Sequence, residues 1–301
     1  MPEASGLASR AMRSDTVGAL VNAMAVILDD AFGDGARREA QELLAALHEM
    51  PRHWPTLERA QRVSTEEWMR AIRAAKRRAR GAPLQYAAGR ASFRHLTLDV
   101  DERVLIPRPE TEQLVELVLD GLRAQPRGVV VDVGTGSGAI ALAVASEGNA
   151  SRVIGTDLSV DALAVARANV ERHAGVLRAP VDLRAGSLLG PVHERALRAV
   201  VSNPPYISWG ERGDLPSSVR DWEPAVALFS DDEGMAVTAR LVRDAAAKLA
   251  PNGMLALEVD SRRASVAAEL IATDGAYEMV KVVLDLTGRE RFVVARRRGA
   301  E

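Results

Sequence analysis

A short apolar run that ends in a glycine-rich turn constrains the fold of this 301-residue chain more than any other feature. The run Val129-Val130-Val131-Asp132-Val133 reads as a buried strand, and Gly134-Thr135-Gly136-Ser137-Gly138 follows it directly. Residues 138–147 then have the composition of a helix. Glycines adopt positive φ angles and let the backbone approach a ligand closely. A strand, a glycine turn and a helix in this order predict the ligand-binding end of an open parallel sheet.

The rest of the C-terminal two thirds alternates between strand and helix patterns. Helices are expected near 110–123, 160–173, 235–249 and 262–272, and strands near 152–156, 181–185, 197–202, 253–259, 278–285 and 290–296. This alternation predicts a mostly parallel sheet with helices on both faces. The last two strands leave no room for a helix between them, so we expect an antiparallel hairpin at one end of the sheet.

Residues 1–82 read as a small helical domain. Ser14 or Asp15 and then Asp34 are candidate caps for the first two helices. Ser64 and Glu67 form a capping-box pattern that opens a third helix ending near Arg80. That helix has a basic face that could meet RNA or an acidic protein, although such faces are more often simply solvated. Its basic residues are Arg70, Arg73, Lys76, Arg77, Arg78 and Arg80.

Residues 83–108 change to a period of two, with Leu96, Leu98 and Val100 alternating with polar residues. A turn at Asp101-Glu102 and an apolar stretch at 104–106 complete a hairpin-like pattern. We therefore expect three parts: a helical domain over 1–82, a β-hairpin connector over 83–108 and an α/β domain over 109–301.

Charge and composition exclude several classes of function. With 39 basic and 41 acidic residues, the net charge of −2 gives no overall attraction to nucleic acid or to an anionic membrane. The chain has no cysteine, which excludes disulfides and thiolate metal sites, and its five histidines lack ligand spacing, so no metal is expected. The apolar stretch 19–28 is too short to cross a membrane. We expect a cytoplasmic protein.

A carboxylate and an asparagine follow two further strands. Asp157 comes about 20 residues after the glycine turn, where a carboxylate accepts the hydroxyls of a ribose, although it could instead cap the next helix. Glycine turns of this kind bind dinucleotides, flavins and S-adenosylmethionine, so the turn alone does not identify the ligand.

Asn203-Pro204-Pro205-Tyr206 follows the strand near 197–202. The prolines could merely stop the strand. At a strand's carboxyl end, however, the Asn203 side-chain oxygen and the Pro204 carbonyl can both accept from one planar NH2 group, and Tyr206 offers a face for a flat substrate. This arrangement fits methyl transfer to a nitrogen whose lone pair is delocalised.

Several stretches resemble the bacterial release factor glutamine methyltransferase (HemK-type) family. The resemblance covers about residues 83–296 and rests on Pro83-Leu84-Gln85-Tyr86, Gly89, the run Val104 to Glu112 (VLIPRPETE), Asn203 to Tyr206, Glu223-Pro224 and Asp285 to Arg289 (DLTGR). Gly186-Ser187-Leu188-Leu189, Asp232-Glu233-Gly234-Met235 and Glu258 to Arg263 depart from the family pattern.

The resemblance implies a Rossmann-like class I S-adenosylmethionine-dependent methyltransferase. It implies methylation at N5 of the glutamine in the Gly-Gly-Gln loop of class I peptide chain release factors, by a monomer that requires no nucleic acid. Gly134 to Gly138, Asp157, Ser187, Leu188 and Asn203 would contact the cofactor, and Asn203 to Tyr206 would hold the glutamine, with Asn203, Pro204 and Tyr206 catalytic. The helical domain would position the protein substrate.

Three other functions stay open on the residues alone. The same pocket would serve glutamine methylation of a ribosomal protein, because only the docking surface would differ. An adenine N6 amine is also planar and would fit the pocket if the base were flipped. The chain could also be an idle cofactor-binding module whose helical domain carries the function.

Overall fold

The computed structural model describes residues 15–123 and 125–299. The chain forms two compact units, Met1–Ala88 and Gly89–Glu301. Within the described ranges, no helix is both long and apolar enough to span a membrane.

The first unit is helical. Its helices are α1 (Val17–Phe32), α2 (Ala36–Leu47), α3 (Trp54–Leu57), α4 (Thr65–Ala79) and α5 (Leu84–Ala88), with the 3-10 turn η1 (Gly33–Gly35) between α1 and α2. Leu20, Met24 and Leu28 of α1 are fully buried and share one core with Leu43 and Leu44 of α2. Helix spacing places these residues on facing stripes, which is why the pattern predicted the unit.

The predicted caps of these helices are confirmed in part. The capping box at Ser64 and Glu67 is confirmed: the Ser64 hydroxyl accepts from the Glu67 N–H, and the Glu67 carboxylate accepts from the Ser64 N–H. Helix α1 is capped by the Thr16 hydroxyl, one residue beyond Asp15, and Ser14 lies outside the described residues. The predicted cap at Asp34 is wrong, because Asp34 lies inside the tight turn η1 and α2 begins without a side-chain cap.

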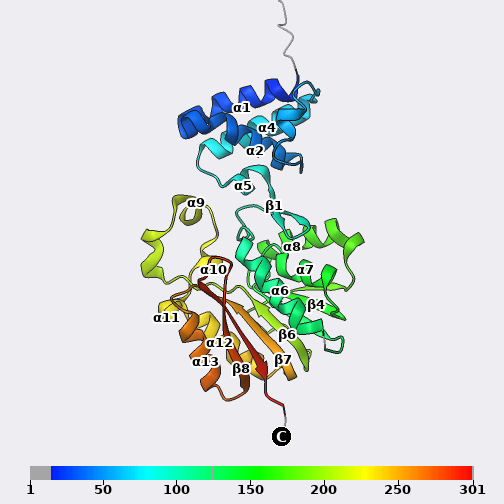
Figure 1. Ribbon diagram of the computed structural model, residues 1–301, viewed down its shortest axis with the longest axis vertical. Coiled ribbons are helices and arrows are strands. Elements are labelled where there is room, and N and C mark those ends of the chain that lie inside the picture. The colour runs from blue at the N-terminus through cyan, green and yellow to red at the C-terminus, as the bar shows by residue number, and fades with distance from the viewer. Residues whose placement is uncertain (1–14, 124, 300–301) are drawn as a thin grey trace, which may run out of the picture. The chain divides into compact units, whose positions relative to one another are not determined.

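The second unit is built on a seven-stranded sheet with the order β5-β4-β3-β6-β7-β9-β8 (Figure 1). The strands are β3 (Val129–Val133), β4 (Arg152–Asp157), β5 (Val181–Ala185), β6 (Leu197–Ser202), β7 (Leu249–Glu258), β8 (Tyr277–Leu284) and β9 (Glu290–Arg297). The first five are parallel, and β9 lies antiparallel between β7 and β8, so the final hairpin is confirmed. The chain winds in opposite directions from β3, so β3 and β6 flank the switch point where such sheets bind ligands.

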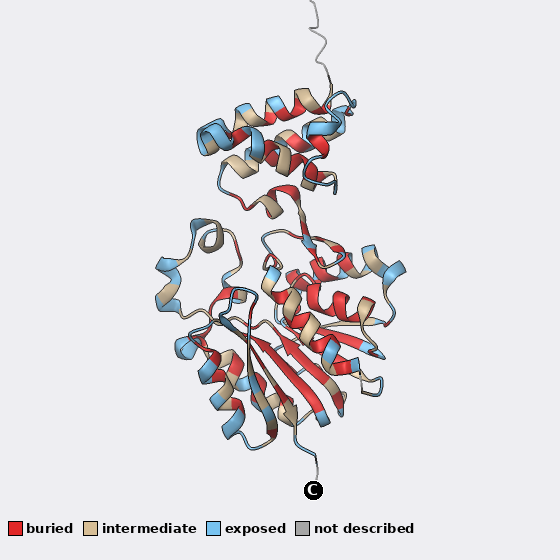
Figure 2. Ribbon diagram, in the orientation of Figure 1, coloured by how far each residue is buried: buried red, intermediate tan, exposed pale blue. Residues whose placement is uncertain are grey.

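Helices cover both faces of this sheet (Figure 1). Helices α6 (Pro109–Arg123), α7 (Ala139–Glu147) and α8 (Val160–His173) pack on one face, and α12 (Ala236–Ala246) and α13 (Ala264–Thr273) pack on the other. The central strands and helix α7 are mostly buried (Figure 2). A strand covered on both faces reads as a continuous apolar run, as residues 129–133 do.

The hairpin before the sheet differs from its predicted form. Its strands are β1 (Arg90–Phe93) and β2 (Leu96–Asp99), so residues 104–106 are not its second strand. Val104 and Leu105 line a cavity, and Ile106 is buried. Burial at the cavity wall, and not strand pairing, therefore accounts for this apolar stretch. Arg94, at the turn of the hairpin, donates to Glu116 of α6 and Glu147 of α7. These contacts fix the hairpin to α6 and α7.

Short elements connect β6 to α12. They are the 3-10 helix η3 (Trp209–Asp214), α9 (Ser217–Arg220), α10 (Ala225–Leu228) and α11 (Asp231–Gly234). Ile207 pairs with Phe229, and Trp209 stacks on Phe229 with ring centroids 4.5 Å apart. These contacts order a long connection directly after the Asn-Pro-Pro-Tyr segment.

Candidate active site

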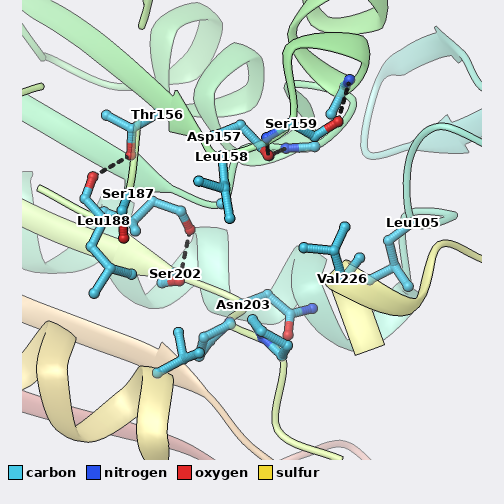
Figure 3. Close-up of a pocket in the computed structure, with 18 of the residues that line it drawn as sticks. Leu105, Thr156, Asp157, Leu158, Ser159, Ser187, Leu188, Ser202, Asn203 and Val226 are labelled. Atoms are coloured by element: carbon cyan, nitrogen blue, oxygen red, sulfur yellow. Dashed lines mark hydrogen bonds between the residues drawn. The ribbon is translucent and has the colours of Figure 1, made fainter. Parts of the chain in front are cut away.

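A cavity of about 390 Å³ lies at the carboxyl ends of β3, β4 and β6. This volume falls in the range typical of small-molecule sites, ~300 to 1,000 Å³. Figure 3 shows Asp157 and Ser159 on one side of the cavity and Asn203 on another, with Leu105 and Val226 nearby. The cavity therefore lies where the sheet topology predicts a ligand.

The glycine turn contributes two of its five residues to the cavity wall, Gly134 and Gly136. Their φ angles are +70° and +55°, in the left-handed region that favours glycine. A Cβ added at either position would have no atom within 4 Å, so open space faces the backbone there. The turn is a cradle for a ligand that approaches the main chain, as the adenosylmethionine implied by the resemblance would do.

The other predicted loop residues hold the turn in shape. Thr135 donates through its hydroxyl to Asp132 Oδ2 at 2.6 Å, and the Ala141 N–H donates to the same oxygen. Burial raises the pKa of Asp132 to about 7. Ser137 is buried, and a Cβ at Gly138 would pack against Leu142 and Ala166. Thr135, Ser137 and Gly138 are not among the residues that line the cavity.

Asp157 ends β4 and lines the cavity. Its Oδ2 accepts from the Gly136 N–H at 2.9 Å, and its Oδ1 accepts from the Ser159 N–H at 2.9 Å. The helix cap is Ser159 instead, whose hydroxyl accepts from the Ala162 N–H. The carboxylate is thus held rigidly, and each oxygen keeps a second lone pair for a ribose hydroxyl.

The loop after β5 also reaches the cavity. Ser187 and Leu188 both line it, and Leu188 has a φ of +52°, with its carbonyl accepting from the Thr156 hydroxyl at 2.8 Å. Leu158 lines the cavity as well, although its side chain stays 65% exposed. Sequence reasoning missed Leu158, whose signal is an apolar residue directly after Asp157.

Asn203, Pro204 and Pro205 leave the end of β6 and line the cavity together. The Ser202 hydroxyl donates to the Val133 carbonyl at 2.7 Å, which ties the end of β6 to the glycine turn. The Asn203 Nδ2 donates to the Thr111 hydroxyl of α6 at 3.2 Å. With its nitrogen turned toward Thr111, Asn203 has its oxygen available as an acceptor.

Tyr206 is placed differently from Asn203, Pro204 and Pro205. It is half-buried and is not among the residues that line the cavity. Burial, with Glu258 nearby, raises the pKa of its hydroxyl to about 12, so the phenol stays neutral at physiological pH. The predicted stacking face of Tyr206 therefore remains a prediction about the protein with substrate bound.

Two sequence stretches that are far apart meet beside the cavity. Glu223 is buried, and its two oxygens accept from Arg108 at 2.5 Å and from the Ile106 N–H at 3.3 Å. The next residue, Pro224, lines the cavity, as does Leu105. The ion pair therefore holds the segment 104–108 against the segment that carries Pro224.

Both units match known protein families. Residues 110–214 match the methyltransferase small domain, and residues 19–89 match the PrmC N-terminal domain. Among solved structures, the hMettl16 catalytic domain is 15% identical with a TM-score of 0.55, covering 79% of this chain and 83% of that one. A methyltransferase from Pyrococcus furiosus is 21% identical with a TM-score of 0.50, covering 67% of this chain and 89% of that one. These structures show the fold of the second unit.

Curated relatives are similar over most of their length. The release factor glutamine methyltransferase of Lactococcus lactis is 32% identical over 91% of this chain and 97% of its own. That of Rhodopirellula baltica is 37% identical over 78% and 79%. That of Gloeobacter violaceus is 42% identical over 70% and 73%. The chain belongs to the release factor glutamine methyltransferase family.

Proposed function

We propose that this protein transfers a methyl group from S-adenosylmethionine to the side-chain nitrogen N5 of the glutamine in the Gly-Gly-Gln motif of peptide chain release factors. The observation that carries the proposal is the pair of acceptors, Asn203 and Pro204, at the end of β6 in the same cavity as the glycine cradle. The methylation would modulate translation termination.

The chemistry requires orientation more than a strong base. An amide nitrogen is a poor nucleophile because its lone pair is delocalised into the carbonyl group. The Asn203 oxygen and the Pro204 carbonyl would accept from its two N–H groups, which moves electron density onto nitrogen and fixes the amide plane. S-adenosylmethionine supplies the methyl group: its carbon–sulfur bond breaks as the carbon–nitrogen bond forms, and a neutral thioether remains.

Departure of the proton needs no dedicated base. The ionisable residues among the described lining are Asp157, Arg103 and Arg240. Asp157 already accepts two backbone N–H groups, and the arginines are donors. After methyl transfer the nitrogen is positively charged and strongly acidic, so it releases its proton to solvent water without a base from the protein.

A transfer assay tests the proposal against its rivals. Labelled methyl is offered to a purified release factor, to the same factor with its Gly-Gly-Gln glutamine changed to alanine, to ribosomal proteins and to DNA. We expect label on the release factor and none on its alanine variant. Label on ribosomal protein or DNA alone would move the substrate assignment to that molecule, and cofactor binding without any transfer would favour an idle module.

The Asp157 carboxylate should determine cofactor affinity. Asp157→Asn puts an amide N–H where the carboxylate now accepts a backbone N–H, so one contact becomes a repulsion. We expect the Kd for S-adenosylmethionine to rise by about 10- to 100-fold, while kcat at saturating cofactor changes little. Calorimetry measures the Kd, with Glu171→Gln on the exposed surface of α8 as the control. Equal affinities in the two variants would contradict the assignment.

We propose that the helical unit docks the protein substrate. Arg70, Arg73 and Lys76 are exposed along one side of α4, and no ion pair involves them among the described residues. A cationic stripe of this kind complements an acidic protein surface and raises the association rate.

Charge reversal tests this docking surface. The double change Arg70→Glu and Arg73→Glu should raise KM for a whole release factor by about tenfold or more, with kcat and cofactor Kd unchanged. The charge-matched control is Arg167→Glu with Arg243→Glu, two exposed arginines of the second unit. A KM that rises equally in both double variants would show a general charge effect and not a docking site.

We infer a monomer that acts in the cytoplasm, where release factors function, and that needs no nucleic acid for transfer. Sedimentation of the purified chain and transfer to a free release factor in the presence of ribonuclease test these two points.

A further inference from the structure

The side chain of Asn203 is the first member of a hydrogen-bonded row of three residues. Its Nδ2 donates to the Thr111 hydroxyl at 3.2 Å, and the Thr111 hydroxyl donates to Glu258 Oε2 at 2.7 Å. Thr111 lies in the first turn of α6, and Glu258 is the last residue of β7. Thr111 is 4% exposed and Glu258 is 1% exposed, so both are removed from water.

Burying a charged carboxylate costs free energy unless an ionic or hydrogen-bonding partner compensates for its lost hydration. Glu258 forms no ion pair with any residue that the structure describes. Charged groups act on it at longer range from several elements, namely Arg291, Glu110 and Arg108, and the Tyr206 phenol is also close. Its one hydrogen bond among the described side chains is with Thr111. Burial, which outweighs these neighbours, raises the pKa of Glu258 to about 7.

The direction of the row follows from the chemistry of its members. An ionised carboxylate only accepts hydrogen bonds, so Thr111 must donate its single hydroxyl proton to Glu258. The lone pairs of the hydroxyl then face Asn203, which must present its NH2 group to them. The oxygen of the Asn203 amide is thereby left for the cavity.

We propose that Glu258 and Thr111 are positioning residues that fix the Asn203 amide with its oxygen toward the substrate, and so make the site select glutamine over glutamate. The inference rests on the proposed function. A glutamine amide donates two N–H groups to the Asn203 oxygen and the Pro204 carbonyl. A glutamate carboxylate has no proton to donate and is repelled by both acceptors.

Protonation of Glu258 reverses the row. A protonated carboxyl donates to Thr111, the hydroxyl is then free to donate to the Asn203 oxygen, and the amide turns its NH2 group to the cavity. The reversed site no longer accepts from a glutamine amide. Activity should therefore rise with pH as Glu258 ionises, since the arginines stay charged and the pKa of Tyr206 is about 12.

The experiment compares Thr111→Val, Thr111→Ser and Glu258→Gln with the wild type in the full chain. Thr111→Val keeps the shape of the side chain but removes its hydroxyl, whereas Thr111→Ser keeps the hydroxyl. Thr238→Val is the matched control, because Thr238 is fully buried in α12 and its hydroxyl has no hydrogen-bond partner in the described structure. Each variant is tested for kcat, melting temperature and binding of two peptides, one with Gly-Gly-Gln and one with Gly-Gly-Glu.

We expect Thr111→Val to lower kcat by about 10- to 100-fold and to lower the ratio of glutamine to glutamate peptide affinity by about tenfold. Thr111→Ser and Thr238→Val should keep both values near the wild type. In Glu258→Gln the rise of kcat from about pH 6 to about pH 8 should disappear. Burial also raises the pKa of Asp132 to about 7, so the Glu258→Gln variant is needed to separate the two carboxylates, and a rise that persists in it does not come from the row.

Two results would overturn the inference. One is an equal loss of affinity for both peptides in Thr111→Val, which is what a merely structural role predicts. The other is an unchanged pH profile in Glu258→Gln. A wild-type protein that methylates no glutamine would refute the proposed function itself, whereas methylation by the wild type with no effect in these variants would refute only the row.

Discussion

Asn203→Ala is expected to lower kcat for glutamine methylation by about 10²- to 10³-fold, the effect of removing one positioned hydrogen-bonding group from a reacting centre. Asn203 supplies one of two acceptors for the amide N–H groups, and the Pro204 carbonyl alone cannot fix the amide plane. The interaction matters most as the nitrogen attacks, so kcat falls more than KM rises.

Single-turnover kinetics with saturating cofactor measure this effect, because they separate the chemical step from product release. Asn149→Ala is the matched control, because the Asn149 amide donates to the Leu122 carbonyl and Asn149 does not line this cavity. Turnover of Asn203→Ala at the rate of the wild type would refute the role of Asn203.

Gly234→Ala is expected to disrupt the segment that follows the acceptor pair. Gly234 has a φ of +87°, and an added Cβ would lie 2.1 Å from the Tyr206 carbonyl oxygen and 2.5 Å from Arg263 Nε. The left-handed backbone alone costs an alanine about 1–2 kcal/mol, and the contact with the Tyr206 backbone adds to it. Tyr206 must therefore move, and the backbone of Pro204 and Pro205 is coupled to it through the chain.

The expected result is a loss of at least about 2 kcal/mol of unfolding free energy together with a drop in kcat. Chemical denaturation and transfer kinetics measure the two quantities. Gly175→Ala is the control, because a Cβ there meets no atom within 4 Å. If Gly234→Ala unfolds and turns over like Gly175→Ala, the turn at 231–234 does not support the acceptor pair.

The left-handed backbone at Gly234 extends to the two residues before it. Asp232 and Glu233 also have left-handed φ values, +50° and +53°, although neither is a glycine. Arg263 holds this turn through the Glu233 carbonyl at 2.6 Å and pairs with Asp260 and Glu211. Strained residues persist only where the surroundings fix them, and here Arg263 makes the contacts that do so.

The parts of the site that the sequence predicted are those that one strand and its following turn define. Gly134, Gly136 and Asp157 follow β3 and β4, and parallel strands bring their carboxyl ends to one edge of the sheet. Asn203 follows β6 for the same reason. Periodicity and turn chemistry were therefore enough to place these residues in one cavity.

The parts that sequence reasoning missed depend on long-range packing. Thr111 and Glu258 are 147 residues apart, and Thr111 and Asn203 are 92 residues apart, so no local pattern joins them. The hairpin strand at 90–93 was missed because residues 104–106 are as apolar as a strand and were assigned to the hairpin instead. In the structure this stretch forms part of the cavity wall. Asp34 looked like a cap because local sequence does not show that Gly33 and Gly35 close a tight turn around it.

Fragment mass spectrometry of the release factor peptide that contains Gly-Gly-Gln tests the central claim most directly. The release factor is incubated with S-adenosylmethionine and either the wild-type protein or Asn203→Ala. We predict that the wild type adds one methyl group to the glutamine side-chain nitrogen and that Asn203→Ala leaves the peptide almost unmodified. A methyl group on any other atom, or an unmodified glutamine after prolonged incubation with the wild type, would contradict the account.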